Sequence, residues 1–315
     1  MATAPSSPKG DKRPRDDQRA RRPRTAETAP ADVRETSTGA SRGRRGPRLR
    51  ALPRQALFTS KGLNTATPVI AFAIHNGHHV RSEIRSHLAI SSAARKREED
   101  PYTGEIAAAV EAHVVVQRSR FEVDLNRPPE RAVYAGRSEA WGLDVWRRRL
   151  PLAVKRESRF EYRAFYGAAY AILADFEHRF GRFLVLDIHS YNHRRDGPDA
   201  PPSSPRRNPE VNVGSSPLDR ELWAPLVRRF NRELASARGD HQALDVRENV
   251  RFRGSHFVTW VHQNFAGSAC ALALEFKKTF MDEWTGRVDR VRLRVLRARL
   301  RRATLASLAE LERMR

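Results

Sequence analysis

The sequence predicts an α/β protein whose mixed, mostly parallel sheet is flanked by helices. Two observations support this prediction. Short apolar runs of strand length recur along the chain, and amphipathic helical patterns separate them. Because parallel strands need a long crossover between them, usually a helix, this alternation is typical of a largely parallel sheet with helices on its faces.

The first 54 residues are unlike the rest of the chain. Residues 1–54 are rich in Pro, Ser, Thr, Gly, Ala and Arg and contain scarcely any large apolar residue. Such a segment cannot bury enough surface to offset the entropy lost on ordering. We therefore expect a disordered basic tail, followed by a single domain over residues 55–315. The hydrophobic fraction of 39% is sufficient for a sizeable core.

Four apolar runs have the length and composition of strands. They are residues 68–74, 112–117, 183–188 and 269–276. Three of them lead directly into a reactive side chain, namely His75, His189 and Glu275. One histidine after a strand is usually only a loop residue. In open α/β sheets, however, ligands bind outside the carboxyl ends of the strands, so the three side chains together predict a site there.

Three segments have helical periodicity. Apolar residues recur at three- and four-residue steps in residues 160–180 and 218–237, and Ser216-Pro217 is a plausible start for the second helix. Residues 288–314 are predicted to form an Arg-rich C-terminal helix whose apolar stripe packs on the domain. The Pro-rich stretch 196–209 is predicted to be a loop, either a cover over the site or a passive surface excursion.

The net charge of +22 raises the possibility of nucleic-acid binding through the basic ends. Residues 1–54 hold 15 Lys and Arg against 6 Asp and Glu, and the last helix is also basic, so much of the excess lies outside the predicted site. We therefore consider nucleic acid an unlikely partner. No apolar run approaches the roughly 20 residues of a membrane helix, and the N-terminus does not resemble a signal peptide. We expect a cytoplasmic protein without membrane attachment.

Two imidazoles and one carboxylate form a frequent catalytic zinc set, although they also suit other divalent ions. A carboxylate at the third strand end would then act as a general base. The third ligand is expected from the acidic cluster Glu98-Glu99-Asp100, and spacing alone does not decide which member binds. Asp187, two residues before His189, is expected to support the site rather than bind the metal.

Arginines follow the predicted strand at residues 112–117. The segment from Arg118 to Pro129 could grip a substrate carboxylate, because a guanidinium can donate two parallel hydrogen bonds. Within it, Asp124 and Arg127 could equally form an internal ion pair that stabilises a turn.

Five blocks, taken in order, resemble the N-formylglutamate amidohydrolase family, which is related to the zinc carboxypeptidases and aspartoacylases. The blocks are His75-Asn76-Gly77, Glu99-Asp100-Pro101-Tyr102-Thr103, Arg120 with Asp124-Leu125-Asn126-Arg127, Asp187-Ile188-His189-Ser190, and Glu275-Phe276-Lys277-Lys278 with Met281-Asp282-Glu283. The resemblance covers roughly residues 65–286. It leaves out the tail and the Arg-rich helix.

The resemblance implies a zinc-carboxypeptidase-like fold, of the phosphorylase/hydrolase-like type, with zinc at the strand ends. By match to the family pattern, the metal ligands would be His75, Asp100 and His189, with Glu99 as the alternative to Asp100. Glu275 resembles the general base. Arg120 would polarise the scissile carbonyl. Asn126 and Arg127 would hold a substrate carboxylate.

The expected activity is that of a zinc-dependent amidohydrolase that cleaves the amide of a small N-acyl amino acid, such as N-formylglutamate. One motif departs from the family pattern, because His75-Asn76-Gly77-His78-His79 stands where His-Ser-Gly is usual. This departure puts the substrate in doubt. Two alternatives stay open, a peptidase-like zinc hydrolase of another carboxylate substrate and a non-catalytic nucleic-acid-binding protein.

Overall fold

The structure is a computed structural model that describes residues 56–216, 218–237 and 242–314. The fold described below belongs to the unit Pro53–Arg315. The predicted tail, residues 1–54, lies outside the described residues.

A seven-stranded sheet forms the centre of this unit. Its strands are β1 (Phe58–Lys61), β2 (Val69–Ala73), β3 (Ala112–Val116), β4 (Phe183–Tyr191), β5 (Val211–Gly214), β6 (Val246–Glu248) and β7 (Ala269–Lys277), in the order β1-β3-β2-β4-β7-β5-β6. The pairs β2·β3, β2·β4, β4·β7 and β5·β6 are parallel, whereas β1·β3 and β5·β7 are antiparallel. The predicted mixed, mostly parallel sheet is confirmed.

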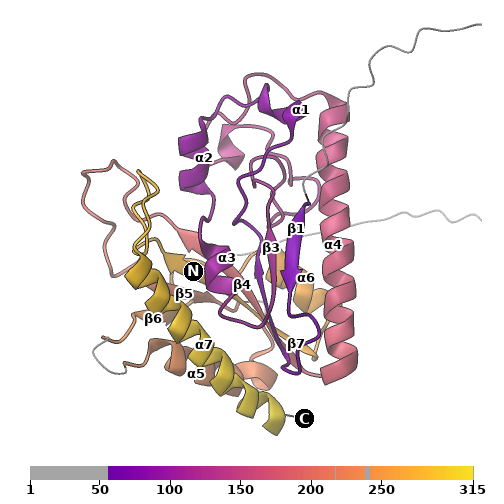
Figure 1. The fold of residues 1–315 in the computed structure, drawn as a ribbon, viewed down its shortest axis with the longest axis vertical. Coiled ribbons are helices and arrows are strands. Elements are labelled where there is room, and N and C mark those ends of the chain that lie inside the picture. The colour runs from indigo at the N-terminus through magenta and orange to yellow at the C-terminus, as the bar shows by residue number, and fades with distance from the viewer. Residues whose placement is uncertain (1–55, 217, 238–241, 315) are drawn as a thin grey trace, which may run out of the picture. The chain divides into compact units, whose positions relative to one another are not determined.

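Helices cover both faces of the sheet (Figure 1). On one face lie α4 (Leu152–Phe180) and α6 (His256–Asn264), and on the other lie α3 (Thr103–Ala107), α5 (Arg220–Ala235) and α7 (Arg290–Arg313). The central strands are apolar on both sides for this reason. In β4, for example, Leu184 and Leu186 pack toward α5 and α7, whereas Phe183 and Val185 pack toward α4 and α6.

The connections around β3 carry the shorter helices. These are α1 (Ser82–Arg85) and α2 (Ser92–Glu98) before β3, and the 3₁₀ turn η1 (Arg137–Glu139) after it. A third, smaller apolar cluster, which includes Ile84, Phe121 and Tyr134, packs between these connections. The long loops beside the carboxyl ends of β2 and β3 therefore have a core of their own.

Two strands extend further than their apolar runs indicate. Residues 183–188 were expected to form a strand that ends before His189, but β4 continues to Tyr191. The predicted strand 269–276 already contained Glu275, and β7 continues one residue further, to Lys277. The reason is the register, which pairs His189 with Glu275 and Tyr191 with Lys277 across the two parallel strands. Both reactive side chains therefore lie on regular, paired backbone rather than in a loop.

Two of the three predicted helices differ from the expectation at their N-termini. α4 begins at Leu152 rather than near residue 160, because its first turns face a polar network and so lack apolar periodicity. The buried residues Ser158 and Glu161 there bind Arg81 and Arg118. α5 begins after the cap Asp219 rather than at Ser216. The Arg-rich C-terminal helix was expected over residues 288–314, and α7 spans Arg290–Arg313.

Within the part of the chain that the structure describes, no helix combines the length and apolar character that a membrane span requires.

Candidate active site

A cavity of about 630 Å³ opens at the carboxyl ends of β2, β4 and β7. Its lining contains every predicted site residue except Arg127, namely His75, Asp100, Arg120, Asn126, His189 and Glu275. Segments far apart in the sequence thus meet where the parallel strands end, as the sequence predicts.

The turn that carries His75 after β2 depends on Gly77. A Cβ atom at this position would lie 2.1 Å from the carbonyl carbon of Gln117, which follows β3. Real side chains do not approach backbone so closely, so a larger residue would push the turn away from β3. Gly77 therefore allows the close packing that holds His75 at the cavity.

Hydrogen bonds join this turn to the loop that carries Asp100. The Asn76 side-chain oxygen accepts a bond from the Gly104 N–H (2.9 Å), and the Asp100 N–H donates to the His75 carbonyl (3.0 Å). Lys278, which is buried, donates to the carbonyls of Arg97 and Glu99 (2.6 and 2.8 Å) from the end of β7. The loop before Asp100 is thereby fixed from two sides.

The side chains of His75, Asp100 and His189 converge. Their potential ligand atoms all lie within 4.8 Å of one another, and all three residues are buried. The Nδ1 atoms of His75 and His189 lie 3.5 and 3.1 Å from Asp100 Oδ2. The His75 Nδ1 atom is buried and has no hydrogen-bond partner among the described residues. We refer to these three residues as the His-Asp-His cluster.

The outer nitrogen of each imidazole faces a second buried carboxylate. His75 Nε2 lies 2.8 Å from Asp124 Oδ1 in a hydrogen bond. His189 Nε2 lies 2.9 Å from Asp187 Oδ2, an ion-pair contact that is too poorly aligned to count as a hydrogen bond. Asp187 and His189 share a face of β4 because they are two residues apart. Carboxylates in this position fix the orientation of metal-binding imidazoles, so the donor set fits a divalent cation.

The pKa values of Asp100 and His189 depend strongly on the charges around them. Burial alone would raise the pKa of Asp100, but His189 and His75 hold it well below its ordinary value, so the carboxylate is ionised. Burial alone would lower the pKa of His189, but Asp187, Asp100 and Glu275 hold it well above its ordinary value. The buried carboxylates around His189 therefore favour its protonated form.

Glu275 lies beside the cluster on the neighbouring strand. It pairs with His189 in the β4·β7 register and lines the same cavity. Burial, with further contributions from Asp100 and Asp187, outweighs the opposing effects of His189 and Arg120 and raises the pKa of Glu275 to about 7. A carboxylate that titrates near neutral pH is suited to accept and return a proton.

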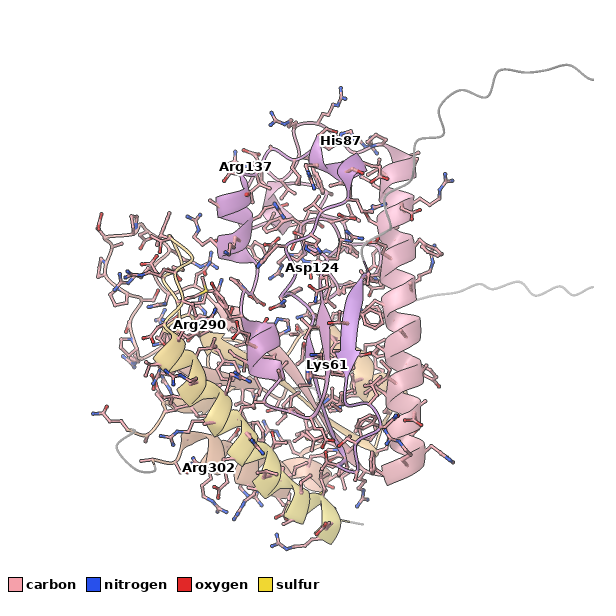
Figure 2. All side chains as sticks on the ribbon, viewed as in Figure 1. Lys61, His87, Asp124, Arg137, Arg290 and Arg302 are labelled. Atoms are coloured by element: carbon pink, nitrogen blue, oxygen red, sulfur yellow. The ribbon has the colours of Figure 1, made fainter. Side chains whose placement is uncertain are left out.

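Arg120 lies on the β3 side of the cavity, where Asp124 holds its guanidinium. Arg120 Nη2 donates to Asp124 Oδ2 (2.9 Å), and its Nε donates to the Tyr134 hydroxyl (3.2 Å). The guanidinium also stacks over Trp141 at 4.7 Å from the ring centroid. Asp124 is thus a shared anchor for Arg120 and His75; it is fully buried, and Figure 2 labels its position.

Asn126 and Arg127 differ in position. Asn126 lines the cavity, with its Nδ2 3.2 Å from His189 Nε2 and its Oδ1 accepting from the Phe257 N–H. Arg127 was expected to hold a substrate carboxylate, but it is absent from the lining. It stacks over Tyr134 at 4.6 Å, and its Nε lies 3.4 Å from Asp124 Oδ2. The structure thus contains the internal ion pair that the sequence left open as the alternative.

Glu99, the alternative third ligand, points away from the cluster. Its carboxylate contacts His78 Nδ1 (2.6 Å), Arg95 Nη1 (3.2 Å) and the Ser119 hydroxyl. The structure therefore places Asp100, and not Glu99, beside the two imidazoles.

Several lining residues were missed at the sequence level. Trp141 and the pair Arg251 and Arg253 line the cavity, and Tyr134 supports it through Asp124. None of them follows a predicted strand, and no local pattern marks them. Residues 196–209, considered as a cover, do not line the cavity, although Asn208 binds Arg251.

Known protein families and solved structures include proteins that are similar to this chain. The family model described as N-formylglutamate amidohydrolase matches residues 67–281. The structure is similar to that of an N-formylglutamate amidohydrolase from Ralstonia eutropha JMP134, with 18% identity, coverage of 82% of this chain and 98% of that chain, and a TM-score of 0.63. A gene product from Agrobacterium tumefaciens is similar at 17% identity, 81% and 96% coverage and a TM-score of 0.59. No curated protein matches the sequence.

Proposed function

The chain belongs to the N-formylglutamate amidohydrolase family, and from this premise we propose that it is a metal-dependent amidohydrolase that cleaves the amide of a small N-acyl amino acid, such as N-formylglutamate. The family supports hydrolysis of an amide. The metal, zinc in our proposal, and the substrate class are inferred from the site itself.

One observation carries the metal dependence. The Nδ1 atoms of His75 and His189 both face the ionised Asp100 carboxylate, while carboxylates occupy the far sides of both rings. A buried imidazole nitrogen without a hydrogen-bond partner is costly unless something binds it. A divalent cation would satisfy that atom and neutralise the acidic surroundings.

A cation in this cluster would supply Lewis acidity, both to activate a water molecule and to polarise the scissile carbonyl. The protein side chains then transfer the proton and stabilise the developing negative charge. Glu275 takes a proton from the attacking water and delivers it to the amide nitrogen as the C–N bond breaks. Arg120, kept charged by Asp124, donates hydrogen bonds to the oxygen on which negative charge develops.

The dimensions of the cavity favour a small substrate over a long peptide. Its volume of about 630 Å³ lies within the range of small-molecule sites, and Trp141 and Arg251 are among the residues that line it. A small N-acyl amino acid, with one amide and at least one carboxylate, matches both the size and the positive lining.

The proposal is tested by hydrolysis of N-formyl-L-glutamate, measured as the formate released. The purified protein is first treated with a chelator and then supplied with zinc or another divalent metal. We expect activity to disappear with the chelator and to return with the metal. Hydrolysis that persists at full rate in the metal-free protein would overturn the metal-dependent mechanism.

A further inference from the structure

Most cationic side chains that line the cavity are already neutralised or fully hydrogen-bonded. Arg120 pairs with Asp124, and Arg195 lies 3.4 Å from Glu98. Lys278 donates to two backbone carbonyls and to the Asn192 side chain. Apart from the contact of Arg120 with the reacting oxygen, these residues therefore have little charge left to bind a substrate carboxylate.

Arg251 and Arg253 are different. Arg253 also lines the cavity without a side-chain partner among the described residues, but it is exposed, whereas Arg251 is half-buried. Among the described residues Arg251 has no acidic partner within ion-pair distance, and its Nε is buried without a hydrogen-bond partner. Within the part of the chain that the structure describes, its only side-chain hydrogen bond is made by Nη1 to the neutral Asn208 oxygen. The guanidinium stacks over the rings of Tyr191 and Phe252, at 5.1 and 5.2 Å from their centroids. Arg251 thus presents an uncompensated, well-oriented positive charge to the cavity.

The backbone that carries Arg251 is fixed to the sheet. Asn212 Oδ1, on β5, accepts hydrogen bonds from the N–H groups of Val250, Arg251 and Phe252 (3.1, 2.8 and 3.3 Å). Its Nδ2 donates to the Phe252 carbonyl (2.8 Å). A segment held by four such bonds loses little entropy when the side chain binds a ligand.

The position of Arg251 fits the remote end of a substrate. Asn212 pairs with Glu275 in the β5·β7 register, so Arg251 and Arg120 approach the cavity from opposite sides of β7. Tyr191, on which Arg251 stacks, lies two residues beyond His189, or about 7 Å along β4. That separation from the His-Asp-His cluster matches the length of a short acidic side chain.

We propose that Arg251 binds a carboxylate at the end of the substrate that is remote from the scissile amide, and thereby selects N-acyl amino acids with an acidic side chain. This inference rests on the proposed function. It assigns to Arg251 a specificity-determining contact, separate from the groups that carry out hydrolysis. A guanidinium binds a carboxylate through two parallel hydrogen bonds, and among the described residues the Arg251 guanidinium uses only Nη1 for a protein acceptor.

The first test compares two substrates of nearly equal shape, N-formyl-L-glutamate and N-formyl-L-glutamine, in which a neutral amide replaces the side-chain carboxylate. For Arg251→Gln, we expect kcat/KM to fall roughly 10- to 100-fold with the glutamate substrate and less than about threefold with the glutamine substrate. Arg251→Lys should recover part of the preference for the glutamate substrate, because lysine keeps the positive charge but lacks the planar pair of N–H donors.

Arg228→Gln is the matched control. Arg228 lies on the exposed side of α5 and does not line the cavity, so its removal changes the net charge equally without touching the site. The inference is overturned if Arg251→Gln lowers kcat/KM equally for both substrates, or if it leaves the preference for N-formyl-L-glutamate unchanged.

A second test does not require hydrolysis. Calorimetry measures the binding of L-glutamate and L-glutamine to the metal-loaded protein and to the Arg251→Gln variant. We expect tighter binding of glutamate by the unaltered protein only. If no substrate is hydrolysed but this difference is seen, the proposed function fails and the role of Arg251 stands. If glutamate fails to bind, or binds both proteins equally, the role of Arg251 is wrong.

Discussion

Each imidazole of the His-Asp-His cluster is held between two carboxylates, one shared and one of its own. Asp100 lies between the two rings, whereas Asp124 and Asp187 lie behind His75 and His189 respectively. An acidic partner of this kind sets the ring orientation and raises the basicity of the ligand. Residues that never contact the metal should therefore influence its affinity.

Replacement of Asp187 tests this arrangement. Asp187→Asn keeps the shape but removes the charge behind His189, so we expect metal affinity to weaken roughly 10- to 100-fold. Competition with a metal-binding dye measures the affinity. Asp175→Asn, which removes an exposed carboxylate on α4, is the control and should change nothing. Equal affinities for all three proteins would show that Asp187 does not support the ligand.

The raised pKa of Glu275 predicts a dependence of stability on pH. In the metal-free folded protein Glu275 has a pKa of about 7, against 4.5 for an unperturbed glutamate. Between these values the folded state holds a proton that the unfolded state has lost, so stability falls as the pH rises through this window. Glu275→Gln removes this dependence.

We therefore expect the chelator-treated Glu275→Gln variant to gain stability relative to the unaltered protein as the pH rises from about 4.5 to about 7, and no further gain above that. Urea unfolding at a series of pH values measures the difference. A difference that does not change with pH would mean that Glu275 titrates at an ordinary value.

The site residues that follow apolar strands could be predicted from the sequence. The residues that contact them and fix their orientation could not. His75, His189 and Glu275 could be found because each adjoins a buried run that is visible in the sequence. Asp124 and Arg251 could not be assigned in the same way. Their roles depend on contacts between residues far apart in the chain, such as that of Asp124 with His75.

At the scale of elements, the turn after β2 positions the site through close backbone packing. Gly77 lies against Gln117 at the end of β3, and Asn76 binds the backbone of Gly104 at the start of α3. These contacts join β2, β3 and α3 where His75 and Asp100, the proposed metal ligands, emerge. A change in the turn should therefore alter stability and metal binding together.

Substitution of glycines separates this effect from a general one. Gly77→Ala would place a methyl group inside the Gln117 backbone, so we expect a loss of stability of roughly 1–3 kcal/mol together with weaker metal binding. In Gly167→Ala the new methyl group meets no atom within 4 Å. This exposed position in α4 should gain about 0.5–1 kcal/mol. Thermal unfolding measures the stability of both variants, and metal titration measures their metal binding. A tolerated Gly77→Ala would contradict the packing argument.

The elements that the sequence failed to predict have weak local signals. β5 and β6 have only four and three residues, and β6 contains charged residues, so both depend on pairing with neighbouring strands. The first turns of α4 were missed because their buried residue, Ser158, is polar and binds Arg81 rather than forming part of an apolar stripe. Periodicity finds apolar faces, and these elements are stabilised by other contacts.

At the scale of the whole molecule, the site lies entirely within the part that resembles the family. The cavity-lining residues fall between His75 and Lys278, inside the match to residues 67–281. We therefore expect deletion of residues 1–52 to leave metal content unchanged and kcat/KM within about twofold, as measured with the deletion variant and the full chain. A large loss of activity would assign the N-terminal segment a part in catalysis.

The central claim is that His75, Asp100 and His189 bind a metal beside a general base, Glu275. Elemental analysis combined with a turnover assay on N-formyl-L-glutamate, for the unaltered protein, Glu275→Gln and His189→Ala, tests it most directly. We expect Glu275→Gln to keep one metal per chain but to lose roughly 100-fold or more in turnover, and His189→Ala to lose the metal itself. A Glu275→Gln variant that turns over at the unaltered rate, or stoichiometric metal in His189→Ala, would contradict the account.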